Sequence, residues 1–239
     1  MATRPIYIPS NEKNRLVTVH EIDFEWFPGF SIAQKQRSIL ALHKAATSQK
    51  ICESPLEIST KSNKSLGFDL SAFNLSFITK KQNKKITVEA AFQASKVFER
   101  GGPYIELLDA DALTAKRYEK LKTSGDLIGF SFFGGEWPLE PKTIFYDWIY
   151  LNALRQNRIL IDKLDTFDAF TDIEFNPKKS INCQAHSVAL FKSLKNRGLL
   201  EKALQSKNNF IEMVGQFSSV HDKSSSDTSK MIETQQTLF

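Results

Sequence analysis

The sequence predicts an α+β fold that is predominantly α-helical, with a few short strands, in one large domain. Of the 239 residues, 41% are hydrophobic, which is ample for a single buried core. Several apolar segments show helical spacing and are bounded by Ser or Thr at the start or by Gly or Pro at the end. The segments that are rich in β-branched and aromatic residues are short, which predicts a minority of strands.

Residues 1–50 predict an arm, a strand and a helix that packs on the core. Residues 4–9 are expected to form a short extended arm or edge strand, because each Pro favours extended geometry in the residue before it. Residues 17–27 are β-rich and aromatic. Ser31 is the predicted N-cap of a helix that runs to about Thr47.

The middle of the chain predicts a strand at residues 56–59, followed by an apolar run at residues 68–78. Thr87 can cap a helix that continues to about Arg100, where a Gly-Gly-Pro sequence ends it. The remaining expected elements are a β-like run at residues 127–133 and helices at residues 111–124, 143–156, 159–167, 182–196 and 199–214.

Charge and composition limit the kinds of site that the chain can carry. A net charge of +5 permits nucleic-acid binding but serves solubility equally well. Cys52 and Cys183 make neither a disulfide framework nor a zinc site, so we expect reduced thiols in a cytoplasmic protein. The four histidines are scattered, no phosphate-binding glycine motif occurs, and no segment has the length and apolarity of a signal or membrane helix. We therefore expect no metal, no cofactor and no membrane partner.

The helix predicted to begin at Thr87 carries three polar residues on one side. At 100° per residue, Glu89, Gln93 and Lys96 fall within about 60° of one another, and the rest of the circle is almost entirely apolar. A buried helix should not carry a carboxylate, an amide and an amine unless they are paired or line a cavity. Two interpretations follow. One is an internal Glu89–Lys96 contact bridged by Gln93, and the other is a polar pocket in which burial tunes acid–base groups.

The same segment resembles the signature helix of a known family. Residues 86–96 read I-T-V-E-A-A-F-Q-A-S-K and are similar to the x-T-x-E-H-x-x-Q-x-x-K helix of the NADAR (YbiA-like) superfamily. Leu70-Ser-Ala-Phe-Asn resembles the family's L-S-N-F segment, and Asp172-Ile-Glu-Phe-Asn resembles its D-x-x-W-G motif. Longer strings from residue 4 to about residue 210 resemble the subgroup of DarT-associated NADAR antitoxins. Four positions depart from the signatures, namely Ala72, Ala90, Phe175 and Asn176.

This resemblance implies a NADAR/YbiA-like domain that hydrolyses the N-glycosidic bond between ADP-ribose and guanine in DNA. The enzyme would act as an antitoxin that reverses a partner DarT-type ADP-ribosyltransferase toxin. The catalytic domain is expected at residues 51–214, with residues 1–50 packed on its core. Residues 215–239 are rich in Ser and Thr and are expected to form a flexible tail.

Three residues are candidates for catalysis. Cleaving a ribose–nitrogen bond requires a carboxylate near the developing oxocarbenium ion or ring-opened sugar, and a group that transfers a proton. Glu89 and Asp172 can form such a pair, by analogy with the two carboxylates of glycoside hydrolysis. Lys96 offers a second route, because a desolvated amine can attack a sugar aldehyde to give a Schiff base. Both routes stay open at this point.

ADP-ribose joined to guanine contains two phosphates and two bases, so its binding site is expected to contain cations and flat side chains. Lys61 and Ser62 follow a short strand in a turn suited to phosphate, and Lys178 and Lys179 lie in a loop near Asp172. Phe73, Tyr104, Trp137 and Phe175 are candidates for stacking on the bases. The other expected ligand-binding residues are Asn74, Gln93, Gly101, Gly102 and Asn182.

Two alternatives to this hydrolase remain. The chain can bind ADP-ribose without cleaving it, or neutralise a toxin by direct contact. It can also act as an N-glycosidase on free metabolites, such as ribosylated intermediates of riboflavin synthesis.

Overall fold

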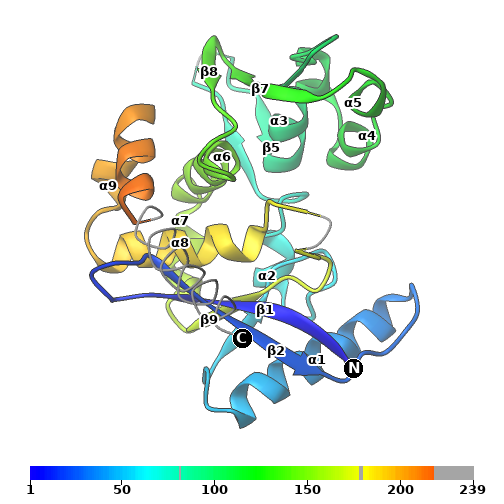
Figure 1. Ribbon diagram of the computed structural model, residues 1–239, viewed down its shortest axis with the longest axis vertical. Coiled ribbons are helices and arrows are strands. Elements are labelled where there is room, and N and C mark those ends of the chain that lie inside the picture. Colours follow the sequence, from blue (N-terminus) through cyan, green and yellow to red (C-terminus); the bar gives the residue numbers. More distant parts are fainter. Residues whose placement is uncertain (81, 178–179, 218–239) are drawn as a thin grey trace, which may run out of the picture.

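One four-stranded sheet combines strands from the N-terminal part of the chain with strands from later parts of the sequence (Figure 1). The computed structural model describes residues 1–80, 82–177 and 180–217. The strand order is β2-β1-β9-β3, in which β1 is antiparallel to both of its neighbours and β9 is parallel to β3. The bounds are β1 (Ala2–Pro9), β2 (Val17–Phe24), β3 (Pro55–Glu57) and β9 (Ala169–Thr171). The predicted N-terminal arm is thus an inner strand of this sheet.

Helices cover both faces of this sheet. α1 (Ile32–Ser48) begins after Ser31, whose Oγ accepts a hydrogen bond of 3.3 Å from the backbone N of Gln34, which confirms the predicted N-cap. Successive side chains of a strand point to opposite faces. Accordingly, Ile6 packs in the cluster that contains the buried residues of α1, whereas the ring of Tyr7 contacts His186 of α8 (Gln184–Asn196).

Helix α6 (Ile144–Arg155) is largely buried and contacts strands of both smaller sheets. A group of aromatic rings fills the space between them, and the Phe130 and Phe145 centroids lie 4.7 Å apart. Phe92 packs against both rings. The strands are β4 (Ser76–Ile78) paired with β5 (Lys85–Thr87), and β7 (Leu127–Phe132) between β6 (Lys96–Phe98) and β8 (Gly135–Trp137).

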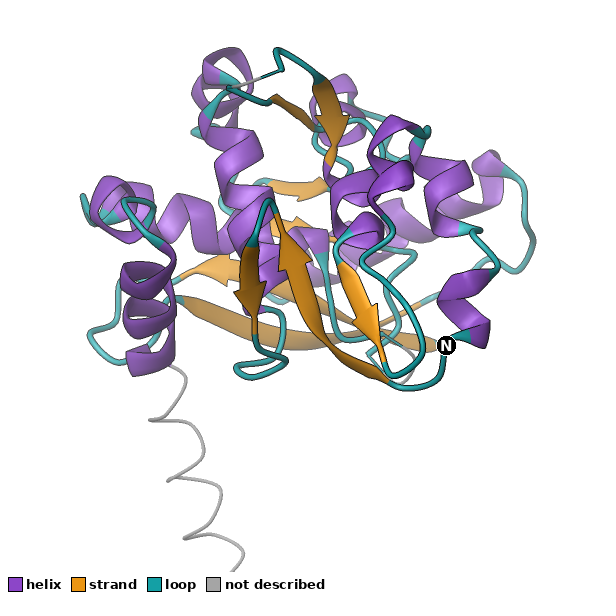
Figure 2. Ribbon diagram, turned by 90° about the horizontal axis from the view of Figure 1, so that it is seen from above, coloured by secondary structure: helices purple, strands orange, loops and turns teal. Residues whose placement is uncertain are grey.

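Helices and strands occur side by side throughout the molecule (Figure 2), so the predicted α+β class is confirmed. The emphasis on helices was too strong, because β1 and β2 each run for eight residues and the strands assemble three sheets. The remaining helical elements are α2 (Ser65–Asp69), α3 (Val88–Ala94), η1 (Ile105–Asp109), α4 (Ala112–Lys116), α5 (Lys120–Thr123), α7 (Arg158–Leu164) and α9 (Leu200–Ala203).

Three helices are shorter than predicted. The segment at residues 111–124 forms two short helices, because α4 ends at Lys116 and the chain turns where the Tyr118 hydroxyl donates to Glu106. The segment at residues 199–214 is also divided, since α9 ends at Ala203 and helical geometry resumes over residues 207–217. The third is α3, which ends at Ala94 instead of continuing to about Arg100.

The N-terminal residues contribute strands to a sheet that also contains β3 and β9, so residues 1–50 are built into the core of the molecule. Of the tail expected from residue 215 onward, the structure describes only the helical residues up to 217. Lys178 and Lys179 also lie outside the described residues. Among the helices that the structure describes, none combines the length and the apolarity that a membrane span requires.

Candidate active site

Most of the polar residues that were singled out in the sequence, and that the structure describes, line one cavity of about 800 Å³. Its walls come from α3, α4, the turn after β3 and the segment between β9 and α8. The predicted residues that line it are Lys61, Phe73, Glu89, Gln93, Lys96, Asp172, Phe175 and Asn182. A separate cavity of about 510 Å³ between β4 and β7 is lined mainly by apolar groups such as Phe77 and Trp148, and it has no carboxylate for acid–base work.

Helix α3 presents Glu89 and Gln93 to this cavity. The Thr87 side chain accepts a hydrogen bond of 3.2 Å from the backbone N of Ala90, as the predicted cap requires. All seven residues of the helix are buried, so its apolar positions anchor it in the core. Glu89 lies in the first turn, where the helix dipole favours a negative charge.

The helix ends at Ala94, before Lys96, so the prediction that all three polar residues share one helix was wrong. Ser95 closes the helix by donating from its Oγ to the Ala91 carbonyl oxygen at 2.7 Å. Lys96 is the first residue of β6 and pairs with Phe130 of β7. The stretch around Val97 is β-branched and aromatic, and pairing with a distant strand decides its conformation.

The carboxylate of Glu89 is held from two sides. Gln93 Nε2 donates to its Oε1 at 2.9 Å, and Lys116 Nζ lies 4.0 Å from the same oxygen. Among the described residues, Lys116 and not Lys96 is therefore the ion-pair partner of Glu89. The Gln93 Oε1 atom is buried and has no hydrogen-bond partner in the described part of the chain. Since a buried acceptor is costly to leave unpaired, this atom is suited to a hydroxyl or N–H of a ligand.

The amine of Lys96 belongs to a partly buried side chain and lies against an aromatic ring. Its Nζ lies over the Phe92 ring, 4.9 Å from the centroid. Burial lowers the pKa of Lys96, and nearby Lys116 lowers it further, while the Glu89 carboxylate opposes both effects. The net lowering increases the fraction of neutral amine, which is the nucleophilic form.

Asp172 reaches the cavity from the end of the parallel pair β3–β9. Glu57 and Thr171 are paired as the last residues of these strands, and Asp172 follows directly. Burial and the neighbouring Glu57 carboxyl raise the pKa of Asp172, so this carboxyl holds a proton more tightly than an exposed Asp. The Gln184 side chain hydrogen bonds to Asp172 and accepts from the Ala72 backbone N at 2.8 Å, which ties α8 to the site.

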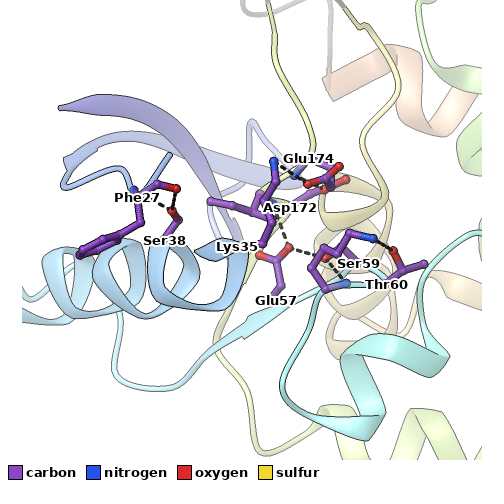
Figure 3. Close-up of polar contacts among 10 residues, drawn as sticks. Phe27, Lys35, Ser38, Glu57, Ser59, Thr60, Asp172 and Glu174 are labelled. Atoms are coloured by element: carbon purple, nitrogen blue, oxygen red, sulfur yellow. Dashed lines mark hydrogen bonds and ion pairs between the residues drawn. The ribbon is translucent and has the colours of Figure 1, made fainter. Parts of the chain in front are cut away.

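Glu57 is a buried carboxyl that the sequence analysis missed, and Figure 3 shows it beside Asp172. Ser59 Oγ donates to its Oε1 at 2.7 Å, and the Ile173 backbone N donates to the same atom at 2.8 Å. Thr171 Oγ1 donates to its Oε2 at 2.6 Å. Since Ser59 precedes the cavity turn and Ile173 follows Asp172, Glu57 fixes both segments relative to each other.

Helix α1 is joined by an ion pair to the segment that follows Asp172. Lys35 Nζ forms an ion pair of 3.0 Å with Glu174 Oε1, and Glu174 also lines the cavity (Figure 3). The Glu174 backbone N donates to Asp172 Oδ1 at 3.1 Å. The N-terminal helix thus contacts the loop that carries Asp172.

Several cavity residues were not anticipated, namely Ser59, Thr60, Phe92, Leu113, Lys116, Arg117, Tyr146, Glu174, Ser180 and Gln184. Lys116 is the last residue of α4 and Arg117 follows it, and both are more than 20 residues from Gln93 in sequence, so no local pattern connects them to it. Gln184 was included in a family-like string but was not singled out. The sequence signal for Glu57 is a carboxylate inside a short apolar strand, which calls for buried partners.

Ser62 and Asn74 lie near the cavity but outside its lining. Ser62 Oγ accepts from the Lys64 backbone N at 3.3 Å, and it also lies against Gly67 of α2. Asn74 Nδ2 donates to the Phe68 carbonyl oxygen at 2.8 Å, so its amide stabilises the turn after α2. Both side chains are therefore used in local structure.

Four other expected ligand residues are also placed outside this cavity. Trp137 is buried against Phe145, with 5.4 Å between ring centroids. The Tyr104 hydroxyl shares a hydrogen bond with Ser124 Oγ, and Gly101 lies directly against the Tyr104 hydroxyl. Gly102 has φ +83° and lies so close to the Lys96 carbonyl that a Cβ there would overlap it. The absence of a Cβ at Gly102 thus allows the chain to pass close to the Lys96 backbone.

The fold and the cavity together define an α+β domain whose polar pocket combines buried carboxyl groups with an amine and exposed cations. The sequence model for DarT1-associated NADAR antitoxins matches residues 2–224, so the chain belongs to this family of NADAR antitoxins. A search of curated proteins found no match.

Proposed function

We propose that the chain is an antitoxin-type hydrolase, acting in the cytoplasm, that removes ADP-ribose from guanine bases of DNA and thereby reverses a DarT-type toxin. The observation that carries this proposal is the meeting of Glu89, Lys96 and Asp172 on one cavity from three separate elements. Membership of an antitoxin family associated with DarT1 supports the biological role.

The cations of the cavity suit a diphosphate. Lys61, Lys116 and Arg117 all line it, and Lys116 and Arg117, at the end of α4, are exposed at its rim. Phosphate oxygens accept charge-assisted hydrogen bonds from ammonium and guanidinium groups. Phe73, whose ring lies 4.9 Å from Lys116 Nζ, offers a flat surface for adenine.

In an acid–base route, the glycosidic bond between the anomeric carbon and the guanine nitrogen breaks and its electron pair goes to the base. Protonated Asp172 donates a proton to the leaving base, because its raised pKa keeps that proton available near neutral pH. The Glu89 carboxylate stabilises the positive charge that develops on the sugar and accepts a proton from the attacking water. The net reaction consumes one water and releases ADP-ribose and the unmodified base.

In a covalent route, the neutral amine of Lys96 bonds to the anomeric carbon of the ring-opened sugar, and the base leaves with a proton. The resulting Schiff base is then hydrolysed by water, which restores the amine and releases ADP-ribose. The lowered pKa of Lys96 supports this route. In both routes residues 51–214 supply the catalytic groups, with residues 1–50 as support.

The first test is release of ADP-ribose from an oligonucleotide that contains ADP-ribosylated guanine. We expect turnover by the native chain, and a loss of about 100-fold or more in Glu89→Gln, because the amide keeps the size but not the charge of the carboxylate. The matched control is Glu53→Gln, which changes an exposed carboxylate outside the cavity. Binding of ADP-ribose without any turnover by the native chain would identify a non-catalytic binding module instead.

A further inference from the structure

A smaller cavity of about 310 Å³ adjoins the candidate active site. Four residues line both volumes: Phe92, Lys96, Tyr146 and Asn182. The two volumes therefore share a wall, and Lys96 is one of the residues at this junction. We call the smaller one the adjoining cavity, and its own walls come from β7 and from residues 138–145.

The two cavities differ in chemistry. The active-site cavity has three carboxyl groups among its lining residues, those of Glu89, Asp172 and Glu174, and it is also rich in cations. The adjoining cavity is mainly apolar, with Phe130, Ile144 and Phe145 as its inner wall. Apart from the shared Lys96, its charged residues are Glu140 and Lys142, and both are exposed. A diphosphate and ribose hydroxyls suit the first lining, whereas a flat aromatic ring suits the second.

Apolar side chains at the mouth of the adjoining cavity are exposed to solvent. Ile181 is 60% exposed and Leu139 is 38% exposed, although both line the cavity. A ligand that covered them would remove apolar surface from water, which is favourable. The backbone at this mouth is also strained, because Thr143 is β-branched and has φ 70°. The hydrogen bond from Thr143 Oγ1 to Asp147 Oδ2, at 2.7 Å, helps to hold it there.

We propose that the adjoining cavity binds the nucleobase from which ADP-ribose is removed, between Leu139 and Ile181 at its mouth. This inference rests on the proposed function, since a base is the leaving group of that reaction. The junction at Lys96 is then the position of the anomeric carbon, with ADP-ribose on the cation-rich side and the base on the apolar side. Asn182, which lines both volumes, is placed to hydrogen bond to the edge of the base.

The test is the double variant Leu139→Ser/Ile181→Ser, assayed with an oligonucleotide that contains ADP-ribosylated guanine. Both side chains are exposed, so the change should leave the fold intact. We expect KM for the modified oligonucleotide to rise about tenfold, since the base loses its apolar contacts. The affinity for free ADP-ribose, measured by calorimetry, should change by less than about twofold, because that ligand has no base on this side.

The matched control is Leu40→Ser/Ile105→Ser, which removes two exposed apolar side chains that line neither cavity. An unchanged KM in the first variant, or an equal loss of affinity for free ADP-ribose, would overturn the base-binding role. Absence of turnover by the native chain would instead overturn the proposed function, so the two failures are distinguishable.

Discussion

At the scale of single residues, the carboxyl of Glu57 has the clearest consequence for chemistry, although it does not line the cavity. Three donors fix its orientation, and its proximity raises the pKa of Asp172. Nothing in the local sequence ties it to Asp172, which lies more than a hundred residues further on. Only the parallel pairing of β3 with β9 brings the two carboxyls together, so sequence reasoning found Asp172 but not the neighbouring carboxyl that adds to burial in raising its pKa.

We predict that Glu57→Gln shifts the alkaline limb of the kcat–pH profile toward lower pH. Removing the neighbouring carboxyl lowers the pKa of Asp172, so its proton is lost at a lower pH and the activity that needs it declines earlier. The groups that act on Asp172 are Glu57 and Glu174, which raise its pKa, and Gln184 and the Glu174 backbone N, which lower it. The profile should be measured beside Glu53→Gln, and identical limbs in the native and Glu57→Gln enzymes would contradict the prediction.

The fold should tolerate Glu57→Gln better than Glu57→Ala. The introduced amide oxygen can still accept from Ser59 and Ile173, and its nitrogen can donate to Thr171 Oγ1, which lies 2.9 Å from His43 Nε2. Burial lowers the pKa of His43 to about 4, so this ring is neutral and can accept the hydroxyl proton in turn. Glu57→Ala leaves buried donors unpaired and should cost about 2–4 kcal/mol of unfolding free energy, against about 1 for Glu57→Gln, by chemical denaturation.

Lys96 gives a residue-scale test of the two proposed routes. Lys96→Arg keeps a positive charge but supplies no neutral amine, because guanidinium does not lose its proton in proteins. If Lys96 is the nucleophile, the variant should lose about 100-fold or more in kcat while it still binds ADP-ribose in calorimetry. Retention of most of the activity would show that only the charge of Lys96 matters, and would favour the route through Glu89 and Asp172.

At the scale of elements, the starts of helices were easier to predict than their ends. The caps at Ser31 and Thr87 lie where the sequence placed them, because capping is a local hydrogen bond between near neighbours. The end of α3 was misplaced because β6 pairs with β7, a strand about thirty residues away. The polar stripe still indicated the cavity, since Lys96 reaches it from the strand that continues α3.

The junction of α3 and β6 depends on Gly102, and this gives an element-scale prediction. Gly102→Ala places a Cβ in contact with the Lys96 carbonyl at a backbone with φ +83°, so we expect a loss of about 3 kcal/mol or more in unfolding free energy. Gly198→Ala is the matched control, because φ there is +67° but no atom lies within 4 Å of the added Cβ. That variant should lose only about 1 kcal/mol. Equal losses in chemical denaturation would show that strain at Gly102, and not contact with β6, sets the cost.

At the scale of the whole molecule, the sequence predicted the class and the family, but only part of the cavity. Residues inside the signature helix or a motif, such as Glu89 and Asp172, lie at the cavity because the motif is local. Aromatic residues that were chosen for their chemistry alone, such as Trp137, are buried in the core. A large ring removes much apolar surface from water when it is buried there. Lys116 and Arg117 were missed because their position depends on how α4 packs against α3.

These two missed cations support a final prediction about the whole charge distribution. A net charge of +5 and the cation-rich rim should make the affinity for modified DNA depend on salt, because each neutralised phosphate releases counterions. We expect KM to rise several-fold between about 50 and 200 mM salt. In Lys116→Ala/Arg117→Ala the dependence on salt should be shallower, whereas Lys163→Ala/Lys202→Ala, which removes two lysines outside the cavity, should retain the native slope. Equal slopes for both variants would mean that the bulk charge of the protein, and not the rim of the cavity, attracts the DNA.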